Sequence, residues 1–162
     1  MRTKTMFALM IAGALVLCLA TTQPAIAASD EEEVLQVISN IYKATNTSDP
    51  NMIEGLYNSE LYSTFGSPKF LAFLTQGREL IESFKKFLSE QPAGTFSGSF
   101  HNPQVTFLGK NVAIVTGYEI FMVNPPVASE QVIEQNRATI VLQKTNGKWL
   151  VVHDHYSHFP TD

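Results

Sequence analysis

The sequence predicts an α+β fold, in which helices come first and pack on one face of an antiparallel sheet. Between residues 29 and 88, apolar side chains recur at the three- and four-residue spacing of amphipathic helices. From residue 95 onward, runs of β-branched and aromatic residues are separated by turn residues, as in successive strands. Helices followed by a block of strands are typical of a layered α+β domain.

The first predicted helix begins at Ser29, which has the capping-box spacing to Glu32, and ends near Asn46. A shorter helix is expected from Asp49-Pro50 through residue 57, and a third from Gly77 to residue 91. Between them we expect a short strand at residues 61–65 and a short apolar piece of undetermined type at 70–74. Each helix carries one apolar stripe, and the polar residues on its other side form a solvated face.

Four long strands are expected, at 95–108 with a bulge or kink at Asn102-Pro103, at 112–123, at 130–144, and in a last ladder that runs from the Asn146-Gly147 turn to Pro160. The last two are joined by Asn146-Gly147, a pair that favours a type I′ hairpin turn. Strict alternation along the 112–123 strand places Glu119 on one face with small residues, which would leave room for a cavity. Along the last strand, alternation gives one face with Trp149, Val151, His153 and His155 and another with Leu150, Val152, Asp154 and Tyr156.

Residues 1–27 are expected to be a secretory signal peptide, which leaves residues 28–162 as a single domain. The segment has a basic start, an apolar run from Met6 to Ala20, and small residues before a cleavage site after Ala27. A retained membrane anchor would need a longer apolar span. The expected location is therefore the periplasm or the exterior, in a bacterial source, with no membrane contact after cleavage.

The composition of the mature chain excludes several classes of function. Cleavage removes two basic residues, leaving 9 basic and 15 acidic residues and a net charge of −6. Such an acidic chain is not expected to bind nucleic acid or anionic membranes. The one cysteine, Cys18, leaves with the signal peptide, so no disulfide, thiol nucleophile or thiolate metal site is expected. No phosphate loop, dinucleotide motif or nucleophile elbow occurs, and we expect no cofactor.

Several segments resemble one known family. These are Asn102-Pro103 with residues 104–109, Gly147-Lys148-Trp149, and residues 152–157, Val-His-Asp-His-Tyr-Ser. They resemble the association (hub) domain of calmodulin-dependent protein kinase II and, more broadly, the SnoaL-like and NTF2-like (cystatin-like) superfamily, which includes ketosteroid isomerase. The resemblance implies a curved sheet wrapped around a long helix, forming a cone with a cavity. It also implies pairing through the outer sheet face into a homodimer or a larger ring.

The resemblance also implies site residues. Hub pockets are lined by arginines from successive strands; Arg137 matches one of these positions, while Glu119 and Tyr156 stand where hubs have two others. Glu119 and Arg137 are expected to form a buried ion pair beneath the sheet. The alternative is catalytic: Glu119 with a pKa raised by burial would act as base, Tyr156 as donor to an oxyanion, and Arg137 as an anchor for a substrate anion.

His153 and His155 have a His-x-His spacing that metal sites also use. The family resemblance explains the pair without a metal, as residues of a subunit interface, so no metal is expected. Asp154 and His155 are expected at the pocket or its mouth.

These observations predict a secreted module that binds a small molecule or assembles with itself. The alternatives are a cofactor-independent isomerase, cyclase or dehydratase and a purely structural oligomer.

Overall fold

The computed structural model describes residues 26–65, 76–125 and 130–159. The chain divides into two units at Asp30/Glu31, and all the strands belong to the second. The apolar piece predicted at 70–74 and most of the predicted signal peptide lie outside the described residues. In the part of the chain that is described, no helix is long and apolar enough to span a bilayer.

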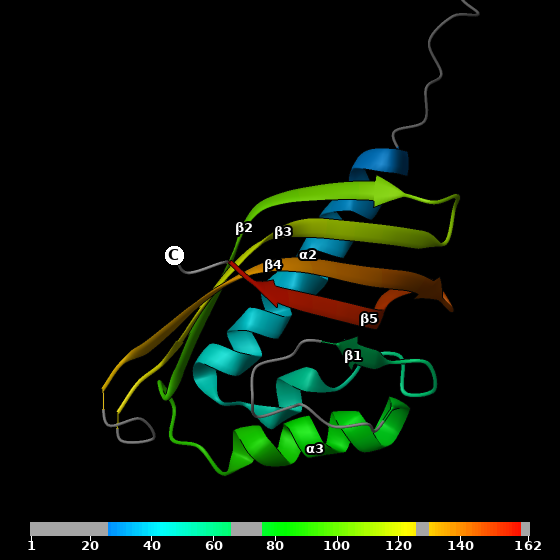
Figure 1. Ribbon diagram of the computed structural model, residues 1–162. Helices are drawn as coiled ribbons and strands as arrows, with labels where there is room; N and C mark the ends of the chain where they lie inside the picture. Colours follow the sequence, from blue (N-terminus) through cyan, green and yellow to red (C-terminus); the bar gives the residue numbers. More distant parts are fainter. Residues whose placement is uncertain (1–25, 66–75, 126–129, 160–162) are drawn as a thin grey trace, which may run out of the picture. The chain divides into compact units, whose positions relative to one another are not determined.

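The described strands form one five-stranded sheet in the order β1-β5-β4-β3-β2 (Figure 1). The strands are β1 (Ser63–Phe65), β2 (Phe96–Phe107), β3 (Val112–Val123), β4 (Val132–Thr145) and β5 (Lys148–His158). β2 to β5 form the predicted antiparallel meander, and the short β1 adds to β5 in parallel. Asn146 and Gly147 both have positive φ, 52° and 79°, which confirms the predicted I′-type hairpin.

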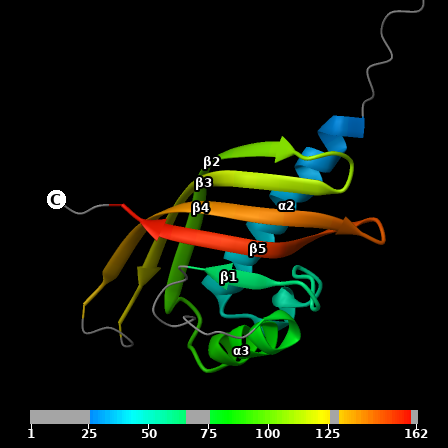
Figure 2. The same ribbon diagram turned by 45° about the vertical axis from the view of Figure 1, so that its right-hand side comes forward.

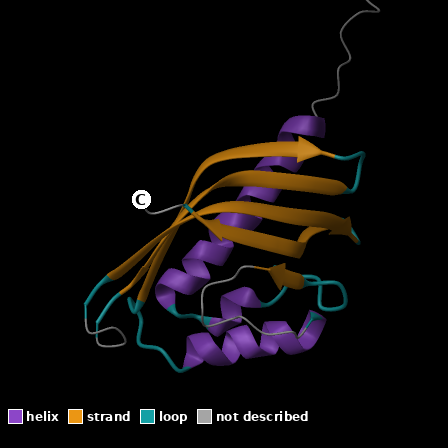
Figure 3. Ribbon diagram, in the orientation of Figure 1, coloured by secondary structure: helices purple, strands orange, loops and turns teal. Residues whose placement is uncertain are grey.

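Within residues 26–65, 76–125 and 130–159, two α-helices and one 3₁₀ turn accompany the sheet: α2 (Ile26–Thr47), η1 (Pro50–Ile53) and α3 (Gly77–Ser89) (Figure 3). The predicted capping box is wrong, because α2 begins at Ile26 and continues through Ser29. The second predicted helix is only the single turn η1. The Asp49 carboxylate accepts a hydrogen bond from the backbone N–H of Asn51 there, and Gly55, with φ of 76°, ends it.

The core lies between α2, α3 and one face of the sheet, which we call the inner face. Buried residues of α2 pack there against alternate residues of three strands, among them Val34, Ile38, Ala113, Leu142 and Val151. In the second view, α2 runs across the strands that curve around it, and α3 lies near β1 (Figure 2). Burial of this apolar area is the main stabilising contribution to the fold.

A β-bulge in β5 changes which side chains reach the inner face. Val141 is opposite His153 while Leu142 is opposite Val151, so Val152 is an extra residue. Asp154 and Tyr156 therefore share the inner face with Val151. The predicted alternation was wrong beyond this point, because a bulge shifts the two-residue period by one.

Candidate ligand-binding pocket

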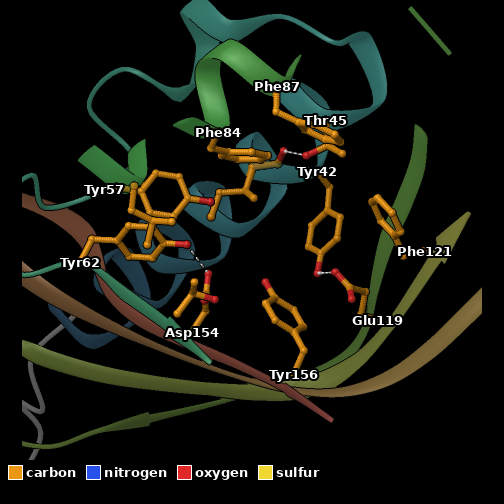
Figure 4. Close-up of a pocket in the computed structure, with 13 residues that line it drawn as sticks. Tyr42, Thr45, Tyr57, Tyr62, Phe84, Phe87, Glu119, Phe121, Asp154 and Tyr156 are labelled. Carbon is orange, nitrogen blue, oxygen red and sulfur yellow. Dashed lines mark hydrogen bonds between the residues drawn. The ribbon is translucent and has the colours of Figure 1, made fainter. Parts of the chain in front are cut away.

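The inner face leaves a cavity of about 70 Å³ between the sheet, α2 and α3 (Figure 4). Four of the five tyrosines line it together with two carboxylates. The lining residues are Ile41, Tyr42, Thr45, Tyr57, Tyr62, Thr64, Leu80, Phe84, Phe87, Glu119, Phe121, Asp154 and Tyr156. No lysine, arginine or histidine is among these described residues, whose ionisable and polar groups are carboxylates and hydroxyls.

Glu119, on β3, is buried with both carboxylate oxygens occupied. The Tyr42 hydroxyl donates to Oε1 at 2.9 Å, and the Asn136 side-chain amide donates to Oε2 at 2.9 Å. Asn136 lies directly opposite Glu119 on β4, so the sheet register sets this contact. Burial raises the pKa of Glu119, while the hydrogen bonds from Asn136 and Tyr42 lower it in part.

Tyr42 is held in place by a close approach between α2 and the edge strand β2. A Cβ atom on Gly98 would lie 2.8 Å from the ring of Tyr42, so this position needs glycine. The Asn46 side chain bonds to both backbone groups of Gly98: Nδ2 donates to the carbonyl at 3.0 Å, and Oδ1 accepts from the N–H at 2.6 Å. These contacts fix α2 against β2 and aim the Tyr42 hydroxyl at Glu119.

Asp154, on β5, is also buried, but only one of its oxygens is occupied. The Tyr62 hydroxyl donates to Oδ2 at 2.9 Å, while Oδ1 has no hydrogen-bond partner among the described residues. The parallel pairing of β1 with β5 sets Thr64 opposite Asp154 and brings Tyr62 within reach. Burial raises the pKa of Asp154 to about 6, and the neighbouring hydroxyl groups of Thr64 and Tyr62 lower it in part.

Tyr156 lies between the two carboxylates, with its hydroxyl directed into the cavity (Figure 4). Burial raises the pKa values of Tyr42, Tyr57, Tyr62 and Tyr156 well above 10.0, and the nearby carboxylates raise them further. All four therefore remain protonated at neutral pH. The ring of Tyr57 packs on that of Tyr62 at 4.4 Å between centroids and meets Phe84 edge-on at 6.4 Å.

Of the residues predicted for the site, the structure brings Glu119, Tyr156 and Asp154 together. Arg137 lies apart from them: it is exposed on the opposite sheet face, with its guanidinium 5.5 Å from the centre of the Phe159 ring. The predicted Glu119–Arg137 ion pair is therefore wrong, because alternation on β4 sends Asn136 inward and Arg137 outward.

His153 and His155 lie on the outer sheet face, opposite Val141 and Thr139 of β4. The Nδ1 atom of His153 is 2.9 Å from the Ser63 hydroxyl, and the His155 ring lies 5.4 Å from that of Phe65. Among the described residues, no group of three or more histidine, cysteine or acidic side chains is arranged to hold a metal ion.

Sequence analysis missed Tyr42, Tyr57, Tyr62 and Asn136. The three tyrosines belong to apolar patterns that predict core positions, and their hydroxyl groups were the only indication of polar surroundings. Asn136 could have been found from one signal. It is a polar residue at a position of the strand that alternation predicts to be buried, and a buried amide needs a hydrogen-bond partner.

Comparisons with known proteins agree with this architecture. The family model for the calcium/calmodulin dependent protein kinase II association domain matches residues 30–160. A solved structure from Xanthomonas campestris, described as a candidate association domain of this kind, is 25% identical with a TM-score of 0.64, covering 80% of this chain and 88% of that one. No functionally curated protein sequence matches the chain.

Two other solved structures share the fold. A nuclear transport factor 2-like superfamily protein from Salmonella enterica is 18% identical with a TM-score of 0.66, and the match covers 83% of this chain and 94% of that one. A candidate scytalone dehydratase from Novosphingobium aromaticivorans is 12% identical with a TM-score of 0.71, covering 84% of this chain and 88% of that one. The predicted α+β, NTF2-like fold is confirmed. By its family match, the chain belongs to the calcium/calmodulin dependent protein kinase II association domain family.

Proposed function

We propose that the mature chain is an exported, self-associating module that binds a small molecule in the inner pocket. The observation that carries the binding role is Oδ1 of Asp154, a carboxylate oxygen that is buried and lacks a hydrogen-bond partner among the described residues. An acceptor in this position costs about 1–3 kcal/mol of stability unless a donor satisfies it. A ligand entering the cavity supplies that donor.

Self-association uses the outer sheet face, which is defined here by residues of β3 and β4 that alternate with the core residues. Tyr118 is 44% exposed and Ile133 is 55% exposed on this face, although both are large and apolar. Apolar side chains gathered on one exposed face are typical of an interface. The name of the family, association domain, supports self-association itself.

Native mass spectrometry of the mature protein tests both roles at once. We expect a dimer or larger ring that carries a discrete extra mass, which gentle activation removes. Ile133→Glu should give a folded monomer, whereas Glu60→Gln, at an exposed position away from this face, should leave the assembly intact. A wild-type protein that is monomeric at micromolar concentration would contradict self-association, and an assembly without bound mass would contradict the binding role.

Export rests on the N-terminal sequence alone, since residues 1–25 lie outside the described ranges. Expression of the full chain in a bacterial host should yield a periplasmic product that begins at Ala28. A cytoplasmic product that still contains Met6 to Ala20 would contradict the proposal.

A second candidate function, acid–base catalysis, is favoured by the same carboxylate. Asp154 has an oxygen without a partner among the described residues and a pKa of about 6, which suits a general base near neutral pH. The Tyr156 hydroxyl is a donor in the same cavity. A neighbour of similar fold is named as a candidate dehydratase. Deuterium exchange into small enolisable ketones, monitored by NMR, tests this function. Exchange that Asp154→Asn abolishes would establish catalysis, and exchange at the buffer rate would exclude it for those substrates.

A further inference from the structure

We propose that the pocket selects a small aliphatic amine, bound as its ammonium ion with Oδ1 of Asp154 as the anchor. The inference rests on the proposed binding function and names the class of its ligand. It follows from three features of the cavity: the sign of its charges, the direction of its hydrogen bonds, and its aromatic walls and size.

The charge of the cavity favours a cation. Both ionisable acidic side chains that line it, Glu119 and Asp154, are buried, and no basic side chain lies among the described lining residues. Burial raises the pKa of each carboxyl group, and no basic side chain among the described lining residues offsets this effect. A bound cation would supply the missing counter-charge at the place where water is largely excluded.

The hydrogen-bonding groups of the cavity also favour a cation. The hydroxyl proton of Tyr62 is donated to Asp154, so the oxygen of Tyr62 is left as an acceptor. Oδ1 of Asp154 is a second acceptor and has no donor among the described residues. An ammonium group has three N–H donors and no acceptor, which matches this arrangement. At these two oxygens a carboxylate or phosphate ligand would meet an acceptor where it needs a donor.

Aromatic rings form the wall beside Asp154. The paired rings of Tyr57 and Tyr62, with Phe84 edge-on to Tyr57, enclose this end of the cavity (Figure 4). The face of an aromatic ring attracts a cation by about 0.5–2 kcal/mol, more where water is absent. The short alkyl chain of the amine would also be stabilised by contact with this apolar surface.

The size of the cavity limits the ligand. About 70 Å³ is far below the 300 Å³ or more of a typical drug-sized site. It holds a few water-sized groups, on the order of an ammonium ion with a short alkyl chain. Amines of about one to four carbons are therefore expected to fit, and steroid-sized amines are not.

The test compares three ligands of nearly equal size: propylammonium, 1-propanol and propionate. Binding to the mature protein is measured by isothermal titration calorimetry and by protein-observed NMR. We expect propylammonium to bind wild type at least ten-fold more tightly than either of the other two. Asp154→Asn, which keeps the shape of the side chain, should lower the affinity for propylammonium at least ten-fold. Glu60→Gln removes one negative charge at an exposed position and should leave the affinity unchanged.

The pH dependence gives a second readout that needs no variant. The titratable groups that interact with Asp154 are Tyr62 on the approach to β1, Tyr57 after η1, Glu119 on β3 and Tyr156 on β5. The tyrosines stay protonated, so with a pKa of about 6 the ionised fraction of Asp154 rises roughly ten-fold between pH 5 and pH 7. Propylammonium affinity should rise with it, and that rise should vanish in Asp154→Asn.

The outcomes separate the ligand class from the binding function. Tighter binding of propanol or propionate than of propylammonium would overturn the amine assignment and leave the pocket a binding site. Release of a ligand without a basic nitrogen from the native assembly would do the same. If none of the three ligands binds and the assembly carries no extra mass, the proposed binding function fails together with the inference.

Discussion

The two carboxylates of the pocket occupy the same sheet face but are built differently. Glu119 receives two hydrogen bonds, from the Tyr42 hydroxyl and the Asn136 amide, one to each oxygen. Asp154 receives the Tyr62 hydroxyl on one oxygen, and the other has no partner among the described residues. The Glu119 end is thus completed within the protein, whereas one oxygen at the Asp154 end is left for the ligand that we propose.

This difference suggests that the two carboxylates have different roles, one in stability and one in binding. A buried carboxylate with both oxygens satisfied ties its neighbours together, and its loss leaves those donors unsatisfied. A buried carboxylate with a free oxygen costs stability, and such a cost is typical of a site that acts on something else. We therefore expect Glu119 to matter mainly for stability and Asp154 mainly for binding.

The largest effect on stability is expected at the Glu119 end. Glu119→Ala leaves the buried donors of Tyr42 and Asn136 without their acceptor, and we expect the free energy of unfolding to fall by about 3 kcal/mol. Urea unfolding at pH 7 measures this loss, with Glu60→Ala as the exposed control. A loss below about 1 kcal/mol would mean that the donors find other partners, and the contrast between the two ends would be lost.

Asp154→Asn should instead change the pH dependence of stability. The folded-state pKa of about 6 lies above the ordinary 3.8, so the folded protein binds this proton more tightly than the unfolded chain does. The favourable contribution of the protonated carboxyl group is complete below pH 4 and is lost as the pH rises through 6, up to about 3 kcal/mol. Wild type should therefore lose stability relative to Asp154→Asn between pH 4 and pH 7. Parallel curves for the two proteins would contradict a raised pKa.

Gly98→Ala tests how the Glu119 end is positioned. The added Cβ would lie 2.8 Å from the Tyr42 ring, and the ring is held by its hydroxyl bond to Glu119. We expect a loss of about 1–3 kcal/mol by thermal or urea unfolding, since overpacking forces the ring or the strand to move. Ser99→Ala, at the exposed neighbouring position, should change stability by less than about 0.5 kcal/mol. Equal losses for the two variants would show that the close approach is not important.

The smallest effect is expected on the pKa of Asp154 when its hydrogen bond from Tyr62 is removed. Tyr62→Phe removes the donor to Oδ2, and this hydrogen bond lowers the pKa of Asp154. The pKa of Asp154 should therefore rise further above 6, and that of Glu119 should change little. Carboxyl-carbon NMR titration of both side chains measures this. A pKa of Asp154 that falls in Tyr62→Phe would mean that water replaces the hydroxyl and that the cavity is wetter than its lining implies.

The sequence predicted the sheet well and the pocket only in part. Alternation along β3 correctly placed Glu119 inside, because no bulge interrupts that strand. The same rule failed on β5, where one extra residue at Val152 turns Asp154 and Tyr156 onto the face of Val151. A register shift of this kind depends on the partner strand, so it is not visible in the strand's own sequence.

The partners of the carboxylates were beyond sequence reasoning for a related reason. Tyr42 reaches Glu119 across 77 positions of the chain, and Tyr62 reaches Asp154 across 92. Contacts at such separation are set by how α2 and β1 pack on the sheet, and local patterns carry no record of them. The family resemblance implied a pocket with arginine, yet Arg137 lies on the other face, so only the position of the cavity could be carried over.

The most direct test of the account is an NMR titration of the Asp154 carboxyl carbon, with and without propylammonium. We predict a pKa near 6 in the free protein and a clear decrease when the amine is bound, because a cation beside Oδ1 favours the ionised form. An Asp154 that titrates near its ordinary value of 3.8, unaffected by the amine, would contradict both the unsatisfied carboxylate and the site built on it.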